Sequence, residues 1–182
     1  DTYSYTKSAT DISILRRAHL RMQKVLDDAW SSRADWMTLA SKREALILAS
    51  IIEKETGVAA DRATIAGVFV NRLTLGMKLQ SDPTVLYAAA ASPQTPTPIT
   101  KTDLKTKTPW NTYVIKGLPK TPICNPGEDS IMAALNPADS DYLYFVSDGK
   151  GGLRFAKTLD VHNRNVRTFR KFEAAAKKDK AQ

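Results

Sequence analysis

The stretch from Ser41 to Gly57 constrains the fold of this chain more than any other part of its sequence. Ser41 and Glu44 form a capping box, which predicts that a helix begins here. Gly57 indicates where that helix ends. Apolar side chains occur on almost every face of the helix, at Ala45, Leu46, Ile47, Leu48, Ala49, Ile51 and Ile52. A helix of this kind is buried in the middle of a domain, so we expect the other elements to pack around it.

Four further helices are predicted from apolar side chains at helical spacing and from capping residues. They are a helix over residues 11–30 with Thr10 as its cap, one that Asp61 caps and Gly76 ends, one over 128–135 after an Asn-Pro-Gly turn, and one that begins after Thr158. The first of these has a single apolar stripe and is interpreted as a packing helix without a catalytic role.

A β-hairpin is predicted from residues 142–146 and 153–155, which flank a glycine-rich turn. Residues 88–100 are rich in alanine, proline, serine and threonine, a composition typical of a surface loop. Several helices with one small antiparallel hairpin make α+β the expected fold class. We expect one catalytic domain over residues 1–182, with a helical lead-in at 1–40, a core at 41–172 and a basic tail at 173–182.

The net charge of +8 is spread along the whole chain rather than gathered in one stretch. Spread charge is typical of a solvated surface, so nucleic acid is not expected as a partner. Cys124 is the only cysteine, which excludes an intrachain disulfide and leaves both cytoplasm and periplasm open. The longest apolar run, residues 45–52, is much shorter than the ~20 residues of a spanning helix. Because the chain begins at Asp1 rather than methionine, we interpret it as part of a longer protein.

Glu53 is the first candidate for a catalytic group. It stands at the end of the buried helix, where desolvation is expected to raise the pKa of its carboxyl. A carboxyl that is neutral near pH 7 can serve as a general acid. On the same helix face, Ala49 and Ser50 are small and are expected to leave room for a ligand, whereas Glu55 lies on the more apolar side. Spacing alone leaves open that both glutamates are solvent-exposed residues at a helix end.

Other types of site find little support. His162 lies on the inward face of its helix, and Asp82 lies in a turn before a proline, where it is a substrate ligand or a turn-former. Two separated histidines and one cysteine give no metal-binding pattern, so no metal is expected. The sequence also has no phosphate-binding loop and no serine nucleophile elbow.

Nine short motifs in order resemble the YceG-like (MltG) family of endolytic murein transglycosylases. They are LASIIEKET at 48–56, VFVNRL at 68–73, MKLQSDPTV at 77–85, WNTY at 110–113, GLP at 117–119, NPG at 125–127, YLYFV at 142–146, DGKGG at 148–152 and HN at 162–163. The resemblance covers nearly the whole chain.

The resemblance implies cleavage of peptidoglycan glycan strands between N-acetylmuramic acid and N-acetylglucosamine, without hydrolysis and without a cofactor. By position in the motif it assigns the catalytic role to Glu53, which gives a proton to the glycosidic oxygen and later accepts one from the sugar's 6-hydroxyl. The product carries a 1,6-anhydro ring. Substrate-binding roles are implied for Glu55, Gln80, Ser81, Asp82, Asn111, Tyr113, Asn125 and His162.

Two positions depart from the family pattern, Leu153 in place of histidine and Val161 in place of a polar residue. The resemblance also implies an inner-membrane anchor outside this chain, a periplasmic catalytic domain and cell-wall synthases as partners. A pyridoxal-phosphate lyase is set aside, because Lys54 is the only lysine near the candidate site and no phosphate loop accompanies it.

Two alternatives remain open. One is a hydrolytic muramidase, for which Asp82 is the only candidate second carboxylate. The other is a non-catalytic binder of peptidoglycan that uses the positive charge.

Overall fold

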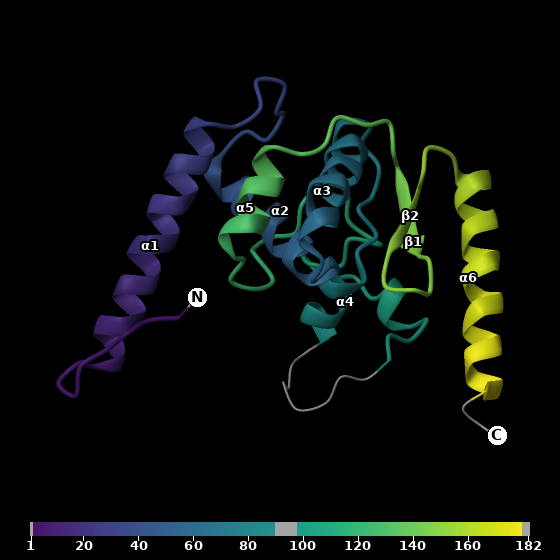
Figure 1. The fold of residues 1–182 in the computed structure, drawn as a ribbon. Helices are drawn as coiled ribbons and strands as arrows, with labels where there is room; N and C mark the ends of the chain where they lie inside the picture. Colours follow the sequence, from purple (N-terminus) through teal and green to yellow (C-terminus); the bar gives the residue numbers. More distant parts are fainter. Residues whose placement is uncertain (1, 90–97, 180–182) are drawn as a thin grey trace.

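The computed structural model describes residues 2–89 and 98–179 and has an α+β fold, as predicted. In chain order the elements are α1 (Asp11–Ser31), α2 (Lys42–Glu55), α3 (Ala59–Thr74), α4 (Asp82–Ala89), the short 3-10 helix η1 (Asp103–Lys105), α5 (Glu128–Leu135), β1 (Tyr144–Ser147), β2 (Leu153–Ala156) and α6 (Leu159–Asp179). Figure 1 shows α2, α3 and α5 in the centre, with α1 at one flank and α6 at the other.

Helix α2 is the centre of the core. Its residues from Ile47 to Ile52 are all buried, and it packs against α1, α3 and α5. The predicted helix start is confirmed, because the Ser41 hydroxyl accepts a hydrogen bond from the backbone N–H of Glu44. The Glu44 carboxylate in turn accepts from the backbone N–H of Ala40, one residue before the cap, at 2.7 Å. These bonds satisfy donors that a helix start otherwise leaves free.

Helix α1 lies at one flank of the molecule (Figure 1). Thr10 caps it by accepting a hydrogen bond from the backbone N–H of Ser13. Ala29 is buried near its C-terminal end, whereas Leu15 in the N-terminal half is 66% exposed. Only the C-terminal half of α1 therefore contributes strongly to the core.

Two predicted boundaries are wrong. Helix α3 begins at Ala59 with Val58 as its N-cap, so Asp61 does not cap it. Asp61 instead lies in the first turn, where a negative charge is favourable beside the helix dipole. The turn predicted at Asp82 is the start of α4, which extends to Ala89. The rest of the predicted loop up to residue 97 lies outside the described residues. Helix α6 extends to Asp179, so part of the basic tail at 173–182 is helical.

The predicted hairpin is confirmed. Strands β1 and β2 pair antiparallel, with Phe145 opposite Phe155. Phe145 meets Phe69 of α3 edge-on at 5.9 Å between ring centroids, which joins the hairpin to the core. Helix α6 packs against both strands of the hairpin. The hairpin therefore links α6 to the central helices.

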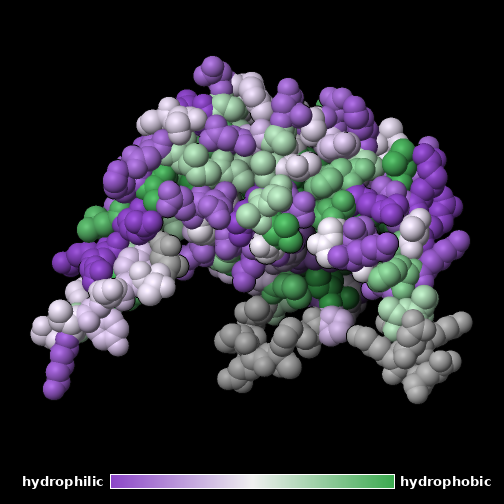
Figure 2. All heavy atoms as spheres, in the orientation of Figure 1, coloured by the Kyte–Doolittle hydropathy of each residue, from purple (hydrophilic) through white to green (hydrophobic). Residues whose placement is uncertain are grey.

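The surface is mixed in character. Figure 2 shows hydrophilic side chains over much of one face, including both flanks, with smaller hydrophobic patches between them. No helix within residues 2–89 and 98–179 is long and apolar enough to cross a membrane.

Candidate active site

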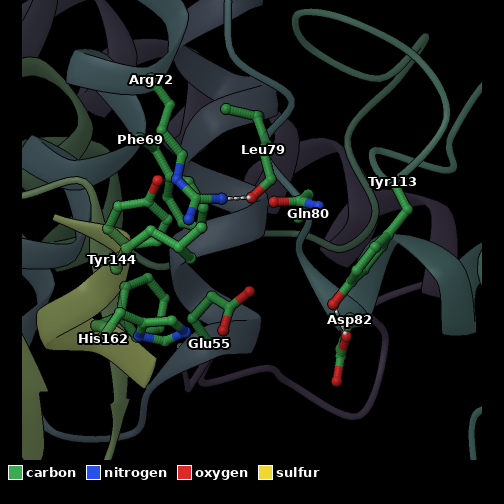
Figure 3. A pocket seen from close by; sticks show the side chains of 11 residues that line it. Glu55, Phe69, Arg72, Leu79, Gln80, Asp82, Tyr113, Tyr144 and His162 are labelled. Carbon is green, nitrogen blue, oxygen red and sulfur yellow. Dashed lines mark hydrogen bonds between the residues drawn. The ribbon is translucent and has the colours of Figure 1, made fainter. Parts of the chain in front are cut away.

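A cavity of about 380 Å³ lies where α2, α3, β1 and α6 meet the segment before α4. We call it the Glu55 pocket (Figure 3). Its lining residues are Glu55, Phe69, Arg72, Leu79, Gln80, Asp82, Tyr113, Tyr144, Phe145, Leu159 and His162. The pocket brings together five of the residues named from the sequence, Glu55, Gln80, Asp82, Tyr113 and His162.

Glu55 presents its carboxyl to this pocket from the last turn of α2. The Ser81 hydroxyl donates a hydrogen bond to Glu55 Oε1 at 2.5 Å. Burial raises the pKa of the Glu55 carboxyl to about 7, and the negative charge of Asp82 adds to that rise. The Ser81 hydrogen bond and the positive charge of Arg72 act in the opposite direction. A carboxyl with this pKa is present in both protonation states near neutral pH and can give or take a proton there.

The opposite wall carries a second carboxyl. Asp82 Oδ1 accepts a hydrogen bond from the Tyr113 hydroxyl at 2.5 Å. Burial and the contact with Asp82 raise the pKa of Tyr113 above its usual range, so the phenol remains protonated and a donor. Gln80 precedes this pair with a left-handed backbone (φ 52°), and its N–H donates to Thr112 O. The strained residue therefore lies directly at the pocket.

His162 enters the pocket from the first turn of α6. Its ring stacks on the ring of Tyr144, with centroids 5.1 Å apart and planes 24° apart. The Nδ1 atom is buried and has no hydrogen-bond partner among the described residues. Burial, with a smaller effect from Arg72, lowers the pKa of His162, so its imidazole is neutral at pH 7. The neutral ring of His162 thus forms part of the pocket lining, stacked on Tyr144.

Glu53 lies outside the Glu55 pocket, because residues two apart on a helix point to nearly opposite sides. Its Oε2 accepts hydrogen bonds from the Ser130 hydroxyl at 2.6 Å and from the N–H of Gly127 at 3.1 Å. The Ser130 bond is the larger cause of a lowered pKa at Glu53, with help from Gly127 and Arg62. The predicted rise in the pKa of Glu53 is therefore wrong, and the raised pKa belongs to Glu55.

The two small residues expected to leave room for a ligand beside Glu53 are covered by other parts of the chain. Ala49 and Ser50 are fully buried rather than open to a ligand. The Ser50 hydroxyl accepts a hydrogen bond from the N–H of Ile123, and its carbonyl oxygen accepts one from the thiol of Cys124. The segment that leads into α5 therefore packs over this face of α2.

Three other residues predicted to bind substrate do not line the pocket. Asn111 is 1% exposed, and its side chain bonds backbone groups of its own loop, including the N–H of Tyr113 at 3.0 Å. Asn125 is exposed and lies with Glu53 at a separate cavity. Ser81 is buried behind Glu55 and acts on it through the hydrogen bond described above. Asn111 and Ser81 therefore support the pocket from behind.

Arg72 and Tyr144 line the pocket although sequence reasoning gave them no role there. In the sequence, Arg72 shares a helix face with Val68 and Phe69, and a charged residue on such an apolar face is a signal that could have found it. Tyr144 was one of several aromatic residues in a strand pattern, and nothing distinguished it. No group of three or more potential metal ligands is present within residues 2–89 and 98–179.

Comparisons with known proteins agree in one family. The model of the YceG-like family matches residues 1–168. The chain is 38% identical over 163 residues to the endolytic murein transglycosylase of Bacillus subtilis (strain 168), covering 90% of this chain and 44% of that protein. It is 36% identical over 172 residues to the protein of the same name from Streptococcus pneumoniae serotype 2 (strain D39 / NCTC 7466), covering 91% and 30%.

The fold agrees as well. A crystal structure of a yceG-like protein from Listeria monocytogenes matches with a TM-score of 0.73 and 39% sequence identity, over 88% of this chain and 52% of that one. The chain spans less than half the length of the curated relatives named above. The family match, the sequence identity and the shared fold show that this chain belongs to the YceG-like family.

Proposed function

We propose that this chain is the catalytic domain of a peptidoglycan lytic transglycosylase, with Glu55 as its single acid and base. The observation that carries the proposal is the Glu55 carboxyl, which faces a cavity and has a pKa raised to about 7. The names of the relatives supply the reaction class, endolytic murein transglycosylase. Glu53 is not chosen, because its carboxyl is held as an anion by Ser130 and Gly127 away from the pocket.

In the first step, protonated Glu55 gives its proton to the glycosidic oxygen between N-acetylmuramic acid and N-acetylglucosamine. Protonation makes that oxygen a better leaving group as the bond breaks and positive charge develops at the sugar carbon. Glu55 becomes a carboxylate in this step. The Ser81 hydroxyl already donates to its Oε1, so the new negative charge meets a hydrogen bond that is in place beforehand.

In the second step, the Glu55 carboxylate accepts the proton of the muramic acid 6-hydroxyl. The hydroxyl oxygen attacks the anomeric carbon of the same sugar and closes a 1,6-anhydro ring. One carboxyl thus serves first as acid and then as base, and it returns to its starting state. Asp82 needs no nucleophilic role in this scheme. With Gln80, Tyr113 and His162 it lines the cavity and is available to hydrogen-bond the sugars.

The proposal extends to the place of action. Glycan strands lie outside the cytoplasmic membrane, so we place the domain on the periplasmic side of the bacterial inner membrane. We further propose a membrane anchor in residues outside this chain and cell-wall synthases as partners.

The test is digestion of purified sacculi, followed by reduction and mass spectrometry of the released glycans. We expect the wild-type chain to release 1,6-anhydro ends and Glu55→Gln to release none. Glu53→Gln is the matched control, since it makes the same change two residues away, and its folded fraction should retain activity. Reducing ends in place of anhydro ends would instead indicate a hydrolase and make Asp82 the second carboxyl. Full activity of Glu55→Gln would refute the assignment.

A further inference from the structure

Arg72 is the buried arginine of the Glu55 pocket. Arg72 is 8% exposed, and Figure 3 shows its guanidinium among the side chains of the pocket, with a hydrogen bond to Leu79. A buried guanidinium remains charged, so it needs hydrogen-bond acceptors around it. The sequence of α3 alone would suit an apolar side chain there, because its neighbours Val68 and Phe69 are core residues. Packing alone therefore does not explain a charged side chain at position 72.

The hydrogen bonds of Arg72 join two separate segments of the chain. Its Nε donates to Leu143 O at 2.6 Å, immediately before β1. Its Nη1 donates to Leu79 O at 2.7 Å and to Lys78 O at 3.3 Å, immediately before Gln80. All three acceptors are backbone carbonyls of the segments that form the pocket walls. The rigid fork of one guanidinium thus fixes the spacing between these walls.

The segment held by Arg72 leads directly to the partner of Glu55. Gln80 has a left-handed backbone, a strained conformation in a residue other than glycine. It persists because Arg72 holds the carbonyls before it and Thr112 holds the N–H groups of Gln80 and Ser81 after it. This conformation places the Ser81 hydroxyl on Glu55 Oε1. Arg72 therefore acts on the Glu55 carboxyl through the loop.

Arg72 also acts on Glu55 by its charge. Five titratable groups besides Glu55 line the pocket, Arg72 from α3, Asp82 at the start of α4, Tyr113 from its loop, Tyr144 from β1 and His162 from α6. His162 is neutral at pH 7 and Asp82 opposes ionisation of Glu55. Arg72 is the one cation among these five, and its contact with the face of Tyr144 at 5.1 Å keeps it in place.

We infer that Arg72 is a positioning residue of this site, which sets the Ser81 hydrogen bond on Glu55 and stabilises the Glu55 carboxylate formed when the proton leaves. The inference rests on the proposed function only for its catalytic consequence. The Glu55 carboxyl and its environment exist without substrate. The electrostatic part can therefore be measured even in a protein that cleaves nothing.

Two substitutions separate the effect of the hydrogen bonds of Arg72 from the effect of its charge. Arg72→Lys retains the positive charge but loses the fork that spans both walls. We expect the pKa of Glu55 to rise, because the Ser81 hydrogen bond that lowers it is no longer held in place. We also expect kcat for sacculi to fall about 10- to 100-fold, because a small displacement of a catalytic group has effects of that size. Arg72→Met removes the charge together with the fork, so we expect the pKa of Glu55 to rise further than in Arg72→Lys, by about 1 unit or more in all.

The pKa of Glu55 is measured by NMR titration of the ¹³C-labelled carboxyl, with folding checked by circular dichroism. Arg62→Met is the matched control, since Arg62 is a mostly buried arginine on the same helix that pairs with Asp129 instead. We expect it to leave the Glu55 pKa unchanged. An unchanged Glu55 pKa in folded Arg72→Met would overturn the electrostatic part. Wild-type kcat in Arg72→Lys would overturn the positioning part, and that variant decides the question if Arg72→Met does not fold. Absence of glycan cleavage by the wild-type chain would count against the proposed function and not against the pKa result.

Discussion

Replacing Glu55 by glutamine is expected to stabilise the protein at alkaline pH while abolishing its activity. The pKa of this carboxyl rises from 4.5 to about 7 on folding. Below about pH 4.5 the folded and unfolded chains both hold the proton, so the substitution has little effect there. Between pH 4.5 and about pH 7 the folded chain binds more protons than the unfolded chain, so the wild-type protein loses stability as pH rises. Glutamine is neutral at every pH and removes that loss.

The magnitude follows from the shift. Each pKa unit corresponds to about 1.36 kcal/mol, so a rise from 4.5 to about 7 corresponds to about 3 kcal/mol above pH 7. The Glu55→Gln side chain has the same shape and still offers an oxygen to the Ser81 hydroxyl, so little packing is lost. The free energy of unfolding should therefore exceed the wild-type value by up to about 3 kcal/mol near pH 8 and by almost nothing near pH 4.

The assay is urea unfolding of both proteins across this pH range, analysed with a common m-value. Glu53→Gln provides a control of opposite sign. Its lowered pKa means that the Glu53 carboxylate stabilises the fold above about pH 4.5 and that this contribution disappears as pH falls. We expect Glu53→Gln to lose about 1–3 kcal/mol near pH 8, through its weakened bonds to Ser130 and Gly127. Equal pH dependence for Glu55→Gln and wild type would refute the reasoning.

Three further substitutions test other parts of the structure. Gly67→Ala would place a Cβ 2.5 Å from the backbone carbonyl oxygen of Ala138, so we expect the free energy of unfolding in urea to fall by about 1–3 kcal/mol. Gly57→Ala is the control, because its Cβ would have nothing within 4 Å and should cause no clash. Ser41→Ala removes the hydroxyl that caps α2 and should lower the free energy of unfolding by about 1 kcal/mol; an unchanged unfolding midpoint would contradict the capping role. Tyr113→Phe removes a hydrogen bond to a carboxylate in the pocket and should lower kcat/KM for sacculi about tenfold with little change in stability, and wild-type kcat/KM would show that the bond is dispensable.

The elements with strong local signals could be predicted from the sequence. Three such signals depend only on neighbouring residues, and each was confirmed. They are the capping box at Ser41, the apolar faces of α2 and the glycine-rich turn of the hairpin. Helix α4 was missed because Pro83 and the following alanine- and proline-rich residues favour a turn or loop by composition. The start of α3 was misplaced because Asp61 is a good capping residue that the chain uses in the first turn instead.

The site was only partly predictable. Sequence patterns named five residues that line the pocket, but they could not tell which glutamate of the motif faces it. That choice depends on what covers each side of α2, and long-range packing decides it. The segment before α5 covers the Glu53 side and supplies the bonds from Gly127 and Ser130, some seventy residues away in the chain. The distant carbonyl of Leu143 likewise gives Arg72 a role that α3 alone does not reveal.

The place of α6 at the flank has a consequence for how the pocket opens and closes. This helix packs chiefly on the two strands of the hairpin, while α2 lies among α1, α3 and α5. Elements with few neighbours unfold locally at a lower free energy than the core. Because α6 carries His162, each local opening that detaches it would remove one wall of the pocket and leave Glu55 on an intact helix. Amide hydrogens of α6 should therefore exchange with solvent sooner than those of α2, and the complete pocket should exist only as long as the flank stays docked.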